Sequence, residues 1–180
     1  QRAEGISPSF EEMKDALASL TMQGKSGAFE LKEAAALMGK MSSAAARFGL
    51  KGGEGLKILG GLSQIARTST GSSEQAATAV EATFRQLVGK SKELQAAGIQ
   101  VFKKGSKSET RDVRDVIVDA IAKKKGSLPA LQQIFGDEGI RGISPLITKF
   151  NAAKNGTTGT EAEKTAAGVA ALREALAAAI

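Results

Sequence analysis

The sequence contains no histidine, cysteine, tryptophan or tyrosine among its 180 residues, and phenylalanine, with 7 copies, is its only aromatic residue. Without histidine and cysteine, the chain cannot assemble the Ser-His-Asp or Cys-His arrangements of nucleophilic catalysis. It also lacks the two main ligands of zinc sites and cannot form disulfide bonds. Catalysis would depend on carboxylates, lysine or serine alone. We therefore expect a protein that is not an enzyme, with no catalytic, cofactor-binding or metal-binding residues.

Long apolar runs are missing as well. We find no signal peptide and no uninterrupted apolar stretch long enough to span a bilayer. The chain begins with Gln1 rather than methionine, so we expect a fragment of a longer protein or a processed chain. Its formal net charge of +6 and its isoelectric point near 9.6 permit attraction to nucleic acid or to an anionic surface without requiring it.

The most prominent residue that is present is alanine, together with leucine, isoleucine and valine. Alanine is the best helix former because ordering it costs no side-chain entropy. Apolar residues recur at helical spacing along nearly the whole chain, for example at Leu56, Leu59, Leu62 and Ile65. The sequence therefore predicts an all-α fold, mainly a bundle of short helices, with at most one small β-hairpin near residues 99–110.

Glycine, serine and proline mark where the predicted helices begin and end. In chain order we expect helices over residues 10–20, 29–48, 56–67, 74–89, 91–97 and 112–125, a short helix opening at Ser127 with Pro129, an apolar stretch over 140–150 that Gly142 and Pro145 break, and a last helix over 161–180. Ser73 and Thr160 are the expected N-caps of the fourth and the last helix. Residues 51–55 are expected to form a loop.

One strand is predicted, over residues 99–102. A lone strand cannot satisfy its backbone, so this segment is either a small hairpin or simply extended chain. We further expect three parts in the chain: a helical core segment over residues 1–150, a flexible linker over 151–159, and a C-terminal helix over 160–180 that is free to pack elsewhere.

Five large apolar residues are predicted to pack in one core. Phe84 and Leu87 fall on one face of a predicted helix, and Ile99 and Phe102 flank the turn that follows. Phe135 ends a short apolar helix and has no other place to bury its ring.

The triplets Gly24-Lys25-Ser26 and Gly89-Lys90-Ser91 have the composition that ends a phosphate-binding loop. Such a loop also needs an earlier glycine after a strand, and the corresponding positions hold Ser19 and Phe84, inside predicted helices. Helix C-caps explain both triplets, so we expect no nucleotide binding.

Three aspartates, Asp112, Asp115 and Asp119, share one face of a predicted helix. Paired carboxylates can serve acid–base chemistry or hold a hard cation. Arg111 and Arg114 interleave with them, which favours a solvated face with local ion pairs.

Two groups of lysines can build a basic patch: Lys103, Lys104 and Lys107, and the helix-ending run at 123–125. Single-stranded nucleic acid usually stacks on aromatic side chains, and only Phe102 is close in sequence. A solubilising face is the alternative interpretation of these lysines.

A series of short motifs follows along the chain. They are LKILGGLSQ at 56–64, SSEQA at 72–76, FRQL at 84–87, LQAAGIQVF at 94–102, the apolar helix at 112–122, and IFGDE at 134–138. In this order and spacing they resemble the core region of phage tail tape measure proteins, over about residues 31–150. The likeness is to the family's paired helices, its helix, glycine turn and Ile-x-Val-Phe strand, and its Phe-Gly-acidic turn. Gly139, Gly142, Pro145 and the segment 103–105 depart from the family pattern.

The resemblance implies a structural protein of a phage or prophage tail, part of the tape measure that sets tail length and assists tail assembly and DNA delivery. The implied partners are tail tube and tail assembly chaperone proteins, with self-association as helices or a coiled coil in the tail lumen. Contact with DNA would be secondary, and contact with a membrane would belong to the full-length protein. The implied location is the virion tail, and the bacterial cytoplasm during assembly. The alternative function is a basic helical binding module for nucleic acid or an anionic membrane surface.

Overall fold

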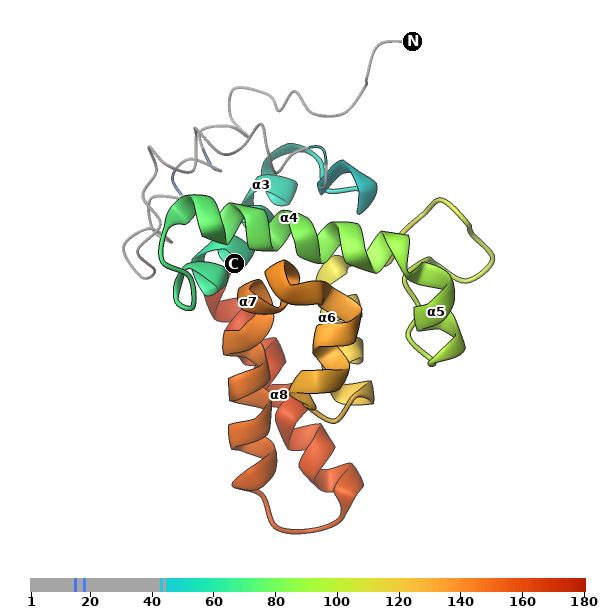
Figure 1. Ribbon diagram of the computed structural model, residues 1–180, viewed down its shortest axis with the longest axis vertical. Helices are drawn as coiled ribbons and strands as arrows, with labels where there is room; N and C mark the ends of the chain where they lie inside the picture. The colour runs from blue at the N-terminus through green and yellow to red at the C-terminus, as the bar shows by residue number, and fades with distance from the viewer. Residues whose placement is uncertain (1–14, 16–17, 19–42, 44) are drawn as a thin grey trace.

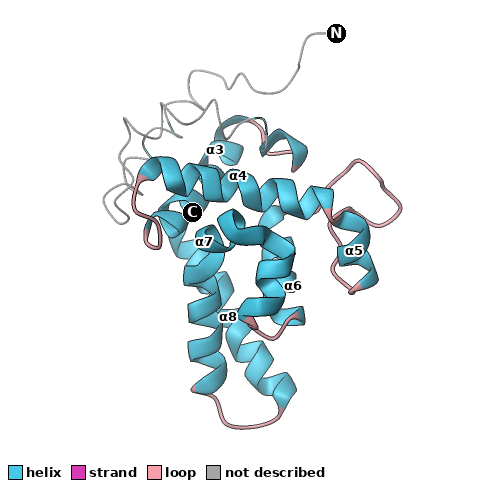
Figure 2. Ribbon diagram, viewed as in Figure 1, coloured by secondary structure: helices cyan, strands magenta, loops and turns pink. Residues whose placement is uncertain are grey.

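The structure, a computed structural model, describes residues 45–180 and the isolated positions 15, 18 and 43. Its helices are α3 Gly52–Arg67, α4 Ser73–Gly89, α5 Ser91–Ala96, α6 Val113–Lys123, α7 Leu128–Asn155 and α8 Glu161–Ala179 (Figure 1). The described part of the chain contains no extended strand, and the predicted all-α fold is confirmed (Figure 2). The helices expected over 10–20 and 29–48 lie mostly outside the described residues.

The hairpin expected near residues 99–110 is reduced to one antiparallel bridge between Phe102 and Thr110. Two backbone hydrogen bonds flank the bridge: Lys103 N–H donates to the Glu109 carbonyl at 2.8 Å, and Arg111 N–H donates to the Val101 carbonyl at 2.9 Å. The segment between α5 and α6 is therefore a closed loop with extended ends rather than a sheet (Figure 2).

Helix α7 is the centre of the packing. It makes its most extensive contacts with α4, which crosses its N-terminal part, and with α8, which runs back alongside it (Figure 1). α3 packs on both α4 and α7, and α6 lies against α8. α5 touches only the end of α4 to any extent and stands at the periphery.

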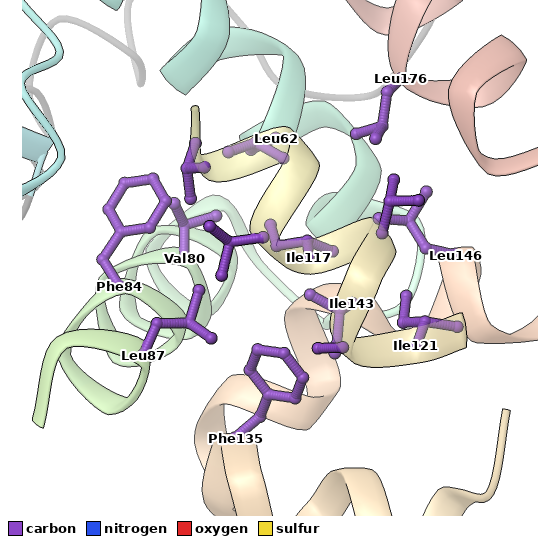
Figure 3. Packing of buried hydrophobic residues seen from close by; sticks show 14 of the residues in the cluster. Leu62, Val80, Phe84, Leu87, Ile117, Ile121, Phe135, Ile143, Leu146 and Leu176 are labelled. Atoms are coloured by element: carbon purple, nitrogen blue, oxygen red, sulfur yellow. The ribbon is translucent and has the colours of Figure 1, made fainter. Parts of the chain in front are cut away.

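The core gathers apolar side chains from all of these helices, α5 included. Figure 3 shows Phe84 and Leu87 of α4, Ile117 of α6, and Phe135 and Leu146 of α7 directed into one interior. All five are buried. Burial of one such side chain stabilises the fold by about 1.5–3 kcal/mol. The hydrophobic effect in this shared core is therefore the main contribution to the packing of the helices.

Helix α3 begins at Gly52, so the loop expected over residues 51–55 is wrong. The glycines there provide close packing instead of a flexible turn. Gly53 and Gly55 are buried, and a Cβ on Gly55 would lie 2.7 Å from the backbone carbonyl carbon of Leu50. Only a residue without a side chain permits that approach.

The break in the last third of the chain is at Gly136, not at Gly142 and Pro145 as expected. Gly136 has φ 71° and ψ 178°, which divides α7 into two helical pieces. Gly142 lies in the helix against α4, where a Cβ would stand 3.1 Å from the Cβ of Ala79. Its missing side chain therefore allows two helices to approach closely.

Pro145 also stays inside α7. Proline has no N–H to donate to the carbonyl four residues earlier, which here belongs to Arg141. The Ser69 hydroxyl, from the turn after α3, donates to that carbonyl. The lost helical hydrogen bond is thus replaced from another element, and the helix continues.

Side-chain caps start the helices at or next to the expected positions. α4 is capped by Ser72, whose hydroxyl accepts from Gln75 N–H at 3.2 Å, rather than by Ser73, which is its first helical residue. Thr160 caps α8 as predicted and accepts from Glu163 N–H at 3.2 Å.

The linker expected over 151–159 is shorter than predicted, because α7 continues to Asn155. α8 also packs on the rest of the fold. Its Leu172 and Leu176 are buried in the common core, and Gly168 lies so close to Phe150 that a Cβ would come within 2.5 Å of the ring. The C-terminal helix therefore belongs to the same packed body as α3 to α7.

Candidate functional site

The triplet Gly89-Lys90-Ser91 joins the end of α4 to the start of α5. Lys90 N–H donates to the Gln86 carbonyl at 2.9 Å, as at an ordinary helix end, and the Lys90 ammonium donates to the Gln133 carbonyl. The lysine that a phosphate loop would direct at a nucleotide is thus occupied in holding α4 to α7. The triplet Gly24-Lys25-Ser26 lies outside the described residues.

The three aspartates of α6 each pair with an arginine. The oxygen–nitrogen distances are 2.6 Å for Asp112–Arg114, 2.8 Å for Asp115–Arg173 and 2.8 Å for Asp119–Arg111. No group of histidine, cysteine, aspartate and glutamate side chains in the described residues could hold a metal ion. The carboxylates are therefore used in ion pairs, and one pair ties α6 to α8.

The environment of Asp112 clearly shifts the pKa of its carboxyl group. Its two oxygens accept from the Arg114 guanidinium at 2.9 Å and 2.6 Å, and one oxygen also accepts from Arg114 N–H as the N-cap of α6. The hydrogen bond from the Arg114 side chain lowers the pKa of Asp112 below its ordinary value, against the opposing effect of partial burial. Asp112 thus serves as both cap and ion-pair partner for the first turn of α6.

The most distinctive surface feature is a cleft between α5 and the loop that follows it, which we call the basic cleft. Its volume is about 1120 Å³. Its lining residues are Ser91, Lys92, Gln95, Gln100, Val101, Phe102, Lys103, Lys104, Gly105, Ser106, Lys107 and Arg111. Five of these are cationic, and the lining holds no aspartate or glutamate. The cleft therefore suits an anionic ligand.

The basic cleft contains only half of the lysines predicted to form a patch. Lys103, Lys104 and Lys107 line it, whereas residues 123–125 end α6 and lie outside the lining. Lys92 and Arg111 were not predicted to join them. A lone lysine in a short helix carries no sequence signal, and it reaches the cleft only because the loop folds back beside α5.

Four of the five predicted core residues, Phe84, Leu87, Ile99 and Phe135, are fully buried and share one cluster. Phe102 is only partly buried, packs against the edge of that cluster, and lines the basic cleft. The alternation of the extended segment explains the difference, because Ile99 and Val101 point inward while Phe102 lies at the rim.

Comparison with known proteins gives one positive finding. The family model for phage-related minor tail proteins matches residues 2–136, more than half of the chain. No curated protein and no solved structure matches the chain. In the described part of the chain, no helix is both long enough and apolar enough to cross a membrane.

Proposed function

Because this chain belongs to the family of phage-related minor tail proteins and is a structural protein of a phage tail, we propose that it forms part of the tape measure that sets tail length. The family match is the observation that carries the proposal. The helical fold and the ordered motifs between residues 56 and 138 support it. In this proposal the chain contributes physical extent and has no enzymatic activity.

The proposed partners follow from that role. The tail tube would surround the chain, tail assembly chaperones would hold it before the tube forms, and copies of the chain would pack together in the lumen of a phage or prophage tail. It would occupy the bacterial cytoplasm during assembly and the virion tail afterwards.

The arrangement of α7 and α8 matters for a ruler. The two helices lie side by side, so together they span little more than the length of one. Measurement by the whole chain requires this pair to open along the tail. The joint between them, residues 156–160, contributes no side chain to the buried core. An insertion at this joint lengthens the chain without removing any side chain from the core.

The test inserts helix-forming sequence into this joint in the parent gene. Segments of about 18 and 36 residues, five and ten helical turns, should lengthen the tail by about 27 and 54 Å, since a helix advances about 1.5 Å per residue. Tail lengths are measured by electron microscopy. As a control, a scrambled insert of equal length and composition should give the same increase, because only extent counts.

Tails of unchanged length with either insert would show that this segment measures nothing. Lengthening by one insert and not by its scrambled control would show that sequence, rather than extent, is read.

A further inference from the structure

We propose that the basic cleft binds the phosphate backbone of DNA. The inference is independent of the ruler role, because it concerns one surface of the fold and can be tested on the isolated chain.

The charge of the cleft is available to a ligand. Lys92, Lys104 and Lys107 are exposed, and no carboxylate of the described residues forms an ion pair with them. Lys103 pairs with Glu109 at 3.4 Å with both side chains more than half exposed, and Arg111 pairs with Asp119 at 2.8 Å. The exposed pair of Lys103 with Glu109 exchanges readily for a phosphate because such a pair contributes little stability. Arg111 is less exposed, and its guanidinium also donates to the Gln100 carbonyl at 2.9 Å, so it lines the cleft as a positive charge held in place. The four lysines can therefore contact an anion directly, and Arg111 adds a fixed positive charge to the wall of the cleft.

The loop that carries most of these cations is held in place before any ligand arrives. The Ser106 hydroxyl accepts from Ser108 N–H at 3.2 Å and from Glu109 N–H at 2.8 Å. The backbone bond from Lys103 to Glu109 closes the loop across its base. A preformed loop loses less conformational entropy when it binds, which favours a ligand that contacts several of its lysines at once.

The distribution of charge in the cleft favours a polymer. Its five cations are spread from Lys92 on α5 along the loop to Arg111, around a volume of about 1120 Å³. Charged groups spread along an open depression of this size match a chain of phosphates better than one enclosed anion.

An anionic membrane fits the cleft less well. Binding at a membrane surface combines positive charge with apolar side chains that insert between lipids. The cleft offers no such anchor, because Val101 is buried and Phe102 is partly buried in the wall. The large apolar residue that is exposed in the described part of the chain, Leu128, starts α7 and does not line the cleft. Phe102 lines the cleft and is the aromatic side chain there on which a base can stack.

The test measures binding of the full 180-residue chain to DNA by fluorescence anisotropy. The probes are a labelled single strand of about 20 nucleotides and its duplex. If five phosphates are neutralised, the affinity should fall about 100- to 500-fold between about 50 and 200 mM salt. The triple variant Lys92→Gln, Lys104→Gln, Lys107→Gln leaves two cations, and its affinity should fall only about 7- to 12-fold over the same range.

A matched control removes the same charge elsewhere. The variant Lys51→Gln, Arg141→Gln, Lys149→Gln changes exposed cations outside the cleft, and its salt dependence should stay close to that of the parent chain. If the triple variant does not fold, Lys104→Gln and Lys107→Gln are compared singly. Each should reduce the slope of log affinity against log salt by about 0.7–0.9.

The two probes distinguish the form of DNA. Tighter binding of the single strand, lost in Phe102→Leu, would indicate base stacking, whereas equal binding of both probes would indicate backbone contact alone. Both results support the proposal. It is overturned if the chain does not bind DNA at low salt, if the cleft variant and the control bind alike, or if the chain binds phosphatidylglycerol vesicles and not DNA.

Discussion

The effect of replacing a glycine in this chain depends on which atoms lie next to its Cα. Gly168 of α8 faces the Phe150 ring, which is fully buried at the end of α7. Alanine is normally better than glycine inside a helix by about 0.8–1.0 kcal/mol. At position 168, however, the added methyl group would lie 2.5 Å from carbons of the Phe150 ring, so the buried ring would have to shift.

We therefore predict that Gly168→Ala destabilises the fold by about 1–2 kcal/mol, because overpacking outweighs helix propensity. Urea denaturation measures the change. The control is Gly89→Ala at the end of α4, where an added Cβ would meet nothing within 4 Å. That variant should be neutral or stabilised by about 0.4–1 kcal/mol. Equal effects at both sites would contradict the close contact between α7 and α8.

The core residues should differ in cost according to their burial. Phe135 is fully buried, so Phe135→Ala should lower the free energy of unfolding by about 3–5 kcal/mol. Phe102 is only partly buried at the rim, so Phe102→Ala should cost only about 1–2 kcal/mol. Thermal and urea unfolding of the two variants give the comparison. A larger loss at Phe102 would show that the loop is a structural centre of the fold.

Asp112 makes stability depend on pH in a predictable direction. Its folded-state pKa is lowered from the ordinary value of 3.8, so its carboxylate stabilises the fold above that pH. This contribution is lost as the pH falls through the lowered pKa. Because the pair with Arg114 is about one-third exposed, it is worth at most about 1 kcal/mol.

Asp112→Asn, which keeps a capping oxygen, should therefore be less stable than the parent chain at pH 7, with the gap closing in acid. Asp112→Ala also loses the cap, at a further cost of about 1 kcal/mol, and should stay less stable at every pH. Urea unfolding across the pH range checks both. A gap between the asparagine variant and the parent chain that persists in strong acid would contradict the ion-pair account.

At the scale of elements, helical periodicity and capping residues predict most of the helices. The positions at which a helix is interrupted are harder to predict from the sequence. The helices from α4 to α6 and α8 were expected close to their observed bounds, because their apolar stripes and caps are local signals. Whether a glycine bends a helix depends on what approaches it. Gly142 and Gly136 look alike in sequence, and both lie next to α4. A Cβ on Gly142 would meet the backbone of α4 at Ala79 within 3.3 Å, whereas a Cβ on Gly136 would meet only the end of the Gln86 side chain, and of the two only Gly136 adopts positive φ.

The candidate site shows the same limit. Lysines 103, 104 and 107 could be found as a local cluster, but the cleft also needs Lys92 and Arg111. Their place depends on how the loop folds back between α5 and α6, which no local pattern encodes. Likewise, the pairing of Asp115 with Arg173 joins residues far apart in sequence.

The continuity of α7 at Pro145 gives a prediction for that element. Because Ser69 supplies the hydrogen bond that Pro145 cannot, Ser69→Ala should lower stability by about 0.5–1.5 kcal/mol. In a Pro145→Ala background the helix regains its own N–H donor for Arg141, and the same substitution should then cost less. Urea unfolding of the four combinations gives the coupling. Equal costs in both backgrounds would show that Ser69 does not compensate for the proline.

At the scale of the whole molecule, the contrast is between a compact body and a ruler. A compact chain of 180 residues has a radius of gyration of about 16 Å. The same chain as one continuous helix would extend about 270 Å. Compact domains are stable by only about 5–15 kcal/mol, so a ruler role requires contacts in the tail to supply about that much free energy to open this one.

We predict that the packed body forms in the free chain and opens in the assembled tail. The chain has no cysteine, so the double variant Asp115→Cys, Arg173→Cys carries thiols at these two positions alone. It reports whether α6 lies next to α8, because the native Asp115 and Arg173 side chains form an ion pair at 2.8 Å. A short bis-maleimide reagent should join the two positions in the purified chain, and an intramolecular link is read from altered gel mobility, with the single-cysteine variants as controls. In isolated tails the link should be lost, because α8 has moved away from α6 along the tail axis. Efficient linking within tails of normal length would mean that the body stays folded, and the chain would then act in the tail as a compact domain rather than as a ruler.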